Sequence, residues 1–123
     1  MKKFDTLTKA EMQVMNALWD MPDGGCIHDI IEKYPEPKPA YNTVLTFLRI
    51  LKEKGFVTSE PTGKQHRFYP AILRGEYTRN YMRNVKDSLC RGSATDLVNF
   101  FVKEENLSAE EIDELIALLR KNE

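Results

Sequence analysis

The chain has 123 residues, enough for one domain with a modest appendage, and its hydrophobic content of 41% is that of a globular protein. Its two cysteines, Cys26 and Cys90, exclude a disulfide framework, and no signal-peptide core or bilayer-length apolar run occurs, so we expect a cytoplasmic protein without membrane insertion. The net charge is −1, yet residues 33–73 hold seven Lys or Arg against three Asp or Glu, which indicates a polyanionic partner or ordinary charge segregation.

The first predicted helix starts after Leu7. Thr8 can cap it, Glu11 stands at the third helical position of a capping box, and apolar residues then recur at helical spacing up to Trp19. Residues 22–25 end it, and residues 26–34 indicate a short second helix before a segment with three prolines in five residues. The spacing predicts a third helix over residues 41–54, with Gly55 just beyond its end.

After Gly55 the pattern changes from helical to β-prone. Two such runs surround the turn PTGKQ and predict a hairpin over residues 57–70. Three helices followed by a hairpin is the order of a winged helix-turn-helix, in which one helix enters the major groove and the hairpin lies beside it. We therefore expect a mainly α protein, with a winged helix-turn-helix domain over residues 1–73 and a small helical dimerisation domain over residues 74–123.

Residues 74–123 are predicted to form three more helices, each with an apolar stripe, and the last repeats the capping signature with Ser108 and Glu111. Because proteins of this type commonly read palindromic DNA as two-fold dimers, we expect a homodimer, with folding back onto the first domain as the alternative. The residues expected at the dimer interface are Leu97, Val98, Phe101, Ile112, Leu115, Ile116 and Leu119.

The third predicted helix has two contrasting faces. Val44, Phe47, Leu48 and Leu51 recur at helical spacing and form one stripe that is expected to be buried. The opposite face holds hydroxyls, an amide and an arginine, and no carboxylate before Glu53, which favours contact with phosphates and base edges; a protein-docking surface is the alternative. The residues expected to contact DNA are Tyr41, Asn42, Thr43, Thr46, Arg49 and Lys52 in this helix, and Lys64 and Arg67 in the hairpin.

No set of residues suggests a reaction. His28 and His66 are the only histidines, neither has a catalytic partner nearby in the sequence, and no glycine-rich phosphate loop occurs. We therefore expect no enzyme, cofactor or metal site. Two other functions stay open: a winged helix that docks a protein, and a regulator that binds a small ligand beside Tyr77 and Tyr81.

Four segments of the sequence, in chain order, show a family resemblance: LTKAEMQVMNALW, YNTVLTFLRILKEKGFV, GKQHRFYP and LVNFFVKEENLSAEEIDEL. They resemble the opening helix, recognition helix, wing and dimerisation region of the penicillinase (beta-lactamase) repressors of the BlaI/MecI type. The resemblance implies a cytoplasmic homodimer that represses transcription by binding a palindromic DNA operator, and that controls beta-lactam resistance or a related regulon. It also implies that Thr43 and Thr46 meet the DNA and that Lys64 and Arg67 touch its backbone.

In such repressors, a membrane sensor of beta-lactams triggers proteolysis at an Asn-Phe bond of the first dimerisation helix. Asn99-Phe100 is such a pair, but an ungapped alignment of FVKEENLS places the cut at Phe100-Phe101, and one residue turns a helix by about 100°. The candidate proteolytic site is therefore Asn99, Phe100 and Phe101. Copper-responsive relatives carry closely spaced C-terminal cysteines, and because none follows Cys90 here, we expect no copper sensor.

Overall fold

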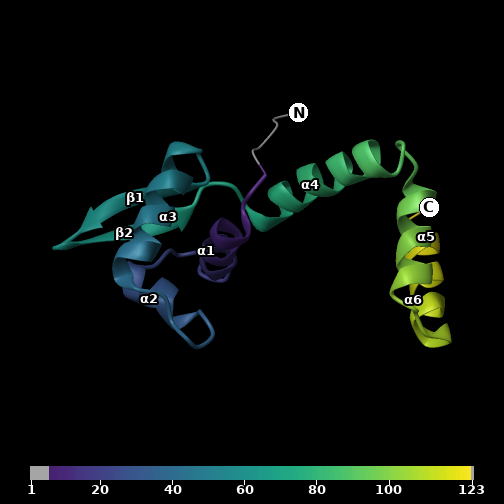
Figure 1. The fold of residues 1–123 in the computed structure, drawn as a ribbon, viewed down its shortest axis with the longest axis horizontal. Coiled ribbons are helices and arrows are strands. Elements are labelled where there is room, and N and C mark those ends of the chain that lie inside the picture. Colours follow the sequence, from purple (N-terminus) through teal and green to yellow (C-terminus); the bar gives the residue numbers. More distant parts are fainter. Residues whose placement is uncertain (1–5, 123) are drawn as a thin grey trace. The chain divides into compact units, whose positions relative to one another are not determined.

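The structure is a computed structural model in which residues 6–122 are described. The chain forms two compact units, one up to Asn80 and one from Tyr81 onward. The first unit contains α1 (Lys9–Trp19), α2 (Ile27–Glu32), α3 (Tyr41–Glu53), β1 (Val57–Thr62) and β2 (Gln65–Pro70) (Figure 1). The helix α4 (Arg74–Leu89) begins in the first unit and ends in the second, which also contains α5 (Ala94–Glu104) and α6 (Ala109–Lys121).

The start of α1 is fixed by the capping box that the sequence predicts. The Glu11 N–H donates to Thr8 Oγ1 at 3.2 Å, and the Thr8 N–H donates to Glu11 Oε1 at 2.9 Å. These reciprocal bonds satisfy two backbone donors that a helix start leaves open. Ser108 and Glu111 form the same box at the start of α6, so both predicted helix starts are confirmed.

The end of α3 turns the chain directly into the hairpin. Gly55 has a φ of +85°, and its N–H donates to the Lys52 carbonyl at 3.1 Å. The Phe56 N–H donates to the Leu51 carbonyl at 2.8 Å, which completes the pair of bonds typical of a left-handed glycine after a helix. Phe56 is thereby buried beneath the helix that it follows, and the predicted position of Gly55 is confirmed.

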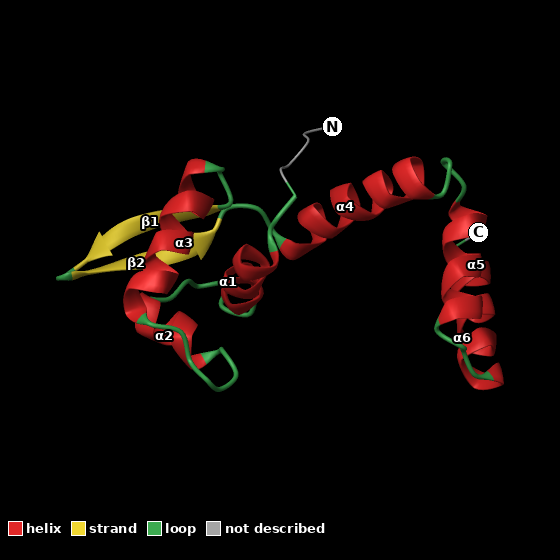
Figure 2. Cartoon of the chain, in the orientation of Figure 1, coloured by secondary structure: helices red, strands yellow, loops and turns green. Residues whose placement is uncertain are grey.

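The two strands form an antiparallel hairpin whose pairs run from Val57 and Pro70 to Thr62 and Gln65. Its base is apolar, since Val57 and Phe68 are buried, whereas residues 60–66 are all exposed. Figure 2 shows the turn end of this hairpin projecting beyond the helices of its unit. Three helices followed by a projecting hairpin confirm the winged helix arrangement and the mainly α fold class.

A backbone pairing ahead of α2 holds the base of the hairpin. The Gly25 N–H donates to the Phe68 carbonyl at 3.0 Å, and the Phe68 N–H donates to the Gly25 carbonyl at 2.9 Å. Gly24, with a φ of +81°, lies so close that an added Cβ would come within 2.7 Å of the Phe68 carbonyl oxygen. Only glycine allows this approach, which fixes the position of the wing against the loop before α2.

The first turns of α4 belong to the first unit, whereas the sequence predicts a boundary at Arg74. Tyr77 is buried, and its hydroxyl oxygen accepts a hydrogen bond from the Leu7 N–H at 2.9 Å. Its ring centroid lies 5.8 Å from that of Phe56 and 5.9 Å from that of Trp19. These contacts close the core of the first unit and extend it to Asn80.

All buried hydrophobic side chains of the described chain lie in the first unit. In the second unit, neither α5 nor α6 contains a fully buried residue. Its apolar stripes therefore remain accessible to solvent within one chain, a situation that a stable folded domain seldom tolerates. Within residues 6–122, no helix has the length and apolar character needed to cross a membrane.

Candidate nucleic-acid interface

Three of the residues expected at DNA share the outer face of α3. Asn42, Thr46 and Arg49 are exposed, and at about 100° per residue they fall on the side opposite to the buried stripe. Within residues 6–122, the Arg49 guanidinium has no hydrogen-bond or ion-pair partner. Thr46 Oγ1 donates to the Asn42 carbonyl at 2.9 Å, so its lone pairs face outward as acceptors. Thr43, also exposed, borders this face.

Tyr41 and Lys52 lie on the flank of α3 and contact other elements of the unit. The Tyr41 ring centroid is 5.3 Å from that of His28 in α2. Lys52 Nζ donates to Ser59 Oγ of β1 at 2.8 Å, which links the last turn of α3 to the hairpin. Both side chains are exposed, but they border the outer face and are not at its centre.

The two expected wing residues have different surroundings. Lys64 lies in the turn between the strands, is exposed, and has no partner in the part of the chain that the structure describes. Arg67 is half-buried, its Nε donates to the Asp23 carbonyl at 2.9 Å, and its Nη2 donates to the Gly24 carbonyl at 3.1 Å. Arg67 therefore holds the loop before α2 against the wing, a role that the sequence does not reveal.

A hollow of about 210 Å³ lies between α2, α3 and β2. The basic side chains around it are Arg49, Lys64, His28 and His66. The sequence does not connect the two histidines, because they lie on different elements and neither belongs to a motif. The one feature of the sequence that could have drawn attention to them is that they are the only two histidines of the chain.

Asp29 is the nearest carboxylate to this hollow along α2. Its Oδ2 accepts hydrogen bonds from the Cys26 N–H at 3.0 Å and from the Cys26 thiol at 3.3 Å. These bonds, helped by the positive charge of Arg67 and by His28, hold the pKa of Asp29 below its usual value. The Asp29 carboxylate therefore interacts with Cys26, the residue before the first turn of α2.

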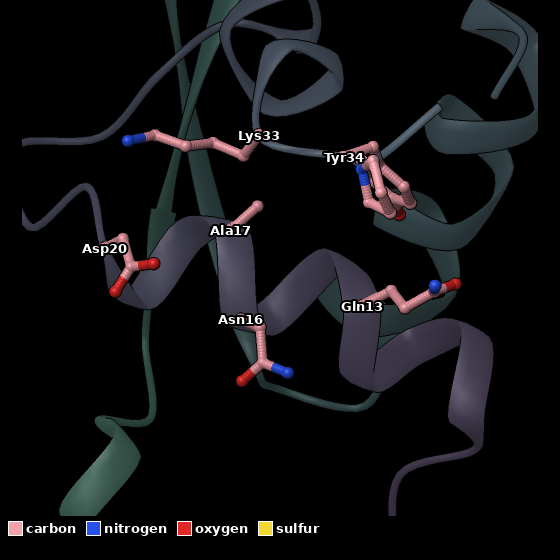
Figure 3. Close-up of a pocket in the computed structure, with 7 residues that line it drawn as sticks. Gln13, Asn16, Ala17, Asp20, Lys33 and Tyr34 are labelled. Carbon is pink, nitrogen blue, oxygen red and sulfur yellow. The ribbon is translucent and has the colours of Figure 1, made fainter. Parts of the chain in front are cut away.

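A second hollow, of about 230 Å³, lies between α1 and the end of α2. Figure 3 shows Lys33 and Tyr34 across from Gln13, Asn16 and Asp20 of the α1 segment. Burial raises the pKa of the Tyr34 hydroxyl. One cation, Lys33, and one carboxylate, Asp20, line this hollow, and none of the residues expected to contact DNA does. A substitution here therefore serves as a control for substitutions on the outer face of α3.

The residues expected at the dimer interface lie on α5 and α6, and none is fully buried. Phe101, Ile116 and Leu119 expose 42%, 45% and 54% of their surfaces. Side chains of α4 and α5, among them Met82, Val85 and Leu97, line an apolar hollow of about 530 Å³. Tyr81 lines this hollow too, and Tyr77 is a core residue of the first unit.

The candidate proteolytic site lies within α5. Asn99, Phe100 and Phe101 are exposed, and the two rings meet edge to face with centroids 5.4 Å apart. Their peptide bonds are part of a regular helix, so a protease that binds an extended chain requires local unwinding of α5.

Three packed helices, a projecting hairpin and a carboxylate-poor third helix define a winged helix protein. The sequence matches the penicillinase repressor family over residues 7–121, and the chain therefore belongs to that family. Family membership makes it a DNA-binding transcriptional repressor and not an enzyme, as the sequence indicates.

Named relatives and a solved structure agree with this family. The methicillin resistance regulatory protein MecI of Staphylococcus aureus (strain N315) is 29% identical over 116 residues, covering 94% of each chain. The penicillinase repressor of Bacillus licheniformis is 25% identical over 122 residues, covering 99% of this chain and 95% of the relative. The solution structure of the monomeric form of Bacillus licheniformis BlaI with the blaP half-operator matches with a TM-score of 0.51 and 24% identity. This match covers 63% of this chain and 94% of that one, and over that part it confirms the winged helix fold.

Proposed function

We propose that this chain is a cytoplasmic repressor that binds a palindromic DNA operator as a homodimer. The α3 helices of the two protomers enter successive major grooves, each wing lies on the adjacent backbone, and the bound dimer blocks access of the polymerase. The observation that carries this proposal is the outer face of α3, where Arg49 is exposed and unpaired among residues 6–122 and no carboxylate precedes Glu53. The half-operator bound to the similar BlaI structure supports it.

The contacts follow from the placement of each side chain. Asn42, Thr46 and Arg49 face the base edges, where an arginine donates to guanine and an outward hydroxyl oxygen accepts from an amino group. Thr43, Tyr41 and Lys52 border that face and meet phosphates of the groove rim, and Lys64 meets the backbone from the wing. Arg67 retains free guanidinium N–H groups for the same backbone while it holds residues 23 and 24.

The apolar faces of α5 and α6 suit a second copy of this chain. None of the seven interface residues named above is fully buried, and three of them are exposed, although large apolar side chains normally become buried. A two-fold axis through these faces buries them and also gives the symmetry that a palindrome requires. The acidic end of the chain, with eight Asp or Glu against three Lys or Arg over residues 92–123, disfavours DNA as the partner of this surface.

The regulated genes concern beta-lactam resistance or a related response, as the names of the relatives suggest. In this proposal, a membrane sensor indirectly triggers cleavage between Asn99 and Phe101. Such a cut separates Leu97 and Val98 from the apolar stripe of α6, and so divides the dimer interface between two fragments. Mass measurement of the chain from cells treated with a beta-lactam should yield a fragment ending at Asn99 or Phe100; an intact chain after derepression contradicts this step.

A selection from a randomised duplex library tests the main proposal. The purified chain should enrich a palindrome with half-sites about 10 base pairs, or a multiple of that, apart. The affinity for the enriched duplex should fall steeply as salt rises, because phosphate contacts release counterions. Lack of enrichment, or salt-insensitive binding, contradicts the proposal and favours the protein-docking alternative.

A further inference from the structure

Both histidines of the chain line the hollow between α2, α3 and β2, together with Arg49 and Lys64. Aromatic neighbours position both imidazoles. The His28 ring centroid lies 5.3 Å from that of Tyr41, and the His66 ring centroid lies 6.4 Å from that of Phe68. Both histidines are exposed, so a ligand outside the chain can reach their ring nitrogens.

The charged groups around His28 are mainly basic. Its own helix provides two carboxylates: Asp29, whose Oδ2 is engaged by Cys26, and Glu32, one turn further along, which does not line the hollow. The helix α3 provides Arg49. The hairpin provides Lys64 and His66 at the hollow, and Arg67 acts on Asp29 from the same strand. The hollow is therefore electropositive even when both imidazoles are neutral.

His66 has a similar environment. Lys64 adjoins it in the hairpin, and Arg49 and His28 reach the same hollow from α3 and α2. The nearest carboxylate across the strands is Glu60, opposite Arg67, and its Oε1 accepts a hydrogen bond from the Tyr69 hydroxyl at 2.6 Å. Among the described residues that line the hollow, none is a carboxylate.

The position of Arg49 relates this hollow to DNA. Arg49 belongs both to the outer face of α3 and to the lining of the hollow, so the hollow adjoins the proposed base-reading face on the wing side. Phosphates line both rims of a major groove, and a helix inside the groove has one rim on each side. The rim on the wing side passes over the hollow if α3 enters the groove.

We propose that this hollow binds a backbone phosphodiester of the operator, and that protonation of His28 and His66 strengthens the contact, so that DNA affinity rises as pH falls. The inference rests on the proposed DNA-binding mode. Imidazole side chains generally change charge near pH 6.5, and a phosphate favours the charged form. Complex formation therefore takes up protons, and the added affinity is present at low pH and lost as pH rises.

The test compares the parent with His28→Gln, His66→Gln and the double variant. Glutamine keeps a side-chain N–H donor but does not titrate, and because no third histidine exists, the double variant removes every imidazole and retains both cysteines and the α-amino group. Fluorescence anisotropy gives the Kd for the selected duplex at fixed salt from about pH 8 to about pH 6. Thermal unfolding of each variant verifies that these exposed substitutions leave the fold intact.

The parent's Kd should fall by about threefold to tenfold per histidine over this range, since an imidazole pKa that rises by about one on binding corresponds to a tenfold change in affinity. The slope of log K against log salt should be steeper at the lower pH by up to about 0.9 per charged imidazole. In the double variant both changes should disappear. Retention of the parent's pH dependence in the double variant overturns the inference, whereas failure of the parent to bind any duplex overturns the proposed function instead.

A free phosphate ion offers the same chemistry, and histidine NMR signals distinguish the two sources. We expect the duplex to shift the ring signals of both histidines, and inorganic phosphate, replacing chloride at equal ionic strength, to leave them unchanged. Saturable shifts with inorganic phosphate, without shifts on DNA binding, identify a free-anion site and overturn the proposal.

Discussion

Lys54 Nζ lies 2.9 Å from Glu11 Oε2, and this ion pair joins the third residue of α1, a member of its capping box, to the residue that caps the end of α3. The Glu11 side chain is 4% exposed and the Lys54 side chain 30%. A second contact, from Lys54 Nζ to Glu11 Oε1, measures 3.2 Å. One buried carboxylate therefore supports both the cap of α1 and the position of α3, on which the DNA-reading face depends.

Replacement of Glu11 by glutamine should lower the free energy of unfolding by about 1–3 kcal/mol, since a buried, charge-assisted hydrogen-bond network loses its charge. Urea unfolding at neutral pH measures this change. Asp20→Asn is the matched control, because it breaks the exposed pair with Arg74 and should cost less than about 1 kcal/mol. Equal losses in both variants contradict a special role of the Glu11–Lys54 pair.

The same pair makes stability depend on pH. Burial of Glu11 raises its pKa, but the hydrogen bonds from Thr8 and Lys54 and the charge of Lys54 outweigh burial and hold that pKa below its usual value of 4.5. Because the pKa is lower in the folded state, this stabilisation is present above that value and is lost as pH falls through the folded-state pKa. The difference between the parent and Glu11→Gln in urea unfolding should therefore shrink at acidic pH. A constant difference down to the acid limit contradicts the assignment.

On the outer face of α3, Arg49→Ala and Thr46→Ala should both weaken operator binding while leaving the dimer intact. Loss of an arginine that contacts a base edge should cost about 1–3 kcal/mol, and loss of a phosphate contact should reduce the salt slope by about 1. Gel shift and a salt titration on the selected duplex measure these effects. Lys33→Ala, which removes a positive charge beside the hollow of Figure 3, is the matched control and should bind like the parent. Unchanged affinity in both α3 variants contradicts the assignment of this face.

The parts of the fold that the sequence predicts are those with local signals. The boxes at Thr8 and Ser108 need residues three positions apart, and Gly55 marks the end of α3 by its own conformational freedom. The pair of Glu11 and Lys54 spans 43 residues and has no such signal. The sequence assigns Arg67 to DNA alone because its protein partners are backbone carbonyls, which any sequence provides.

In the candidate site, too, the sequence predicts what lies within one element and does not predict what separate elements bring together. The outer face of α3 can be derived from helical spacing, because its members belong to one helix. The hollow beside it combines residues of α2, α3 and β2, and only the packing of these elements brings His28 and His66 to the same place. The stripes of α5 and α6 predict apolar faces, but the identity of their partner depends on a second chain.

Gly24→Ala should destabilise the first unit by at least about 1–3 kcal/mol, since the residue needs a positive φ and an added Cβ would meet the Phe68 carbonyl oxygen at 2.7 Å. Gly75→Ala is the matched control, because an added Cβ there would have no neighbour within 4 Å beyond the adjoining residues and the backbone of its own helix, and alanine favours the helix by about 0.5–1 kcal/mol. Thermal unfolding should show a lower Tm for the first variant and a slightly higher one for the second. A Gly24→Ala protein as stable as its parent contradicts the close packing of the wing against this loop.

A glutamate on the apolar face of α6 should separate the proposed dimer. Leu115→Glu or Ile116→Glu places a carboxylate where a second chain is expected, and a buried charge without a partner costs several kcal/mol. Since each 1.4 kcal/mol changes a dissociation constant about tenfold, the dimer Kd should rise by about a hundredfold or more. Ala117→Glu is the matched control, because it adds the same charge on the opposite side of the helix, about 120° or more from the stripe centre. Sedimentation of Leu115→Glu at the parent's mass, in a protein whose first unit remains folded, contradicts the assignment of α6 to the interface.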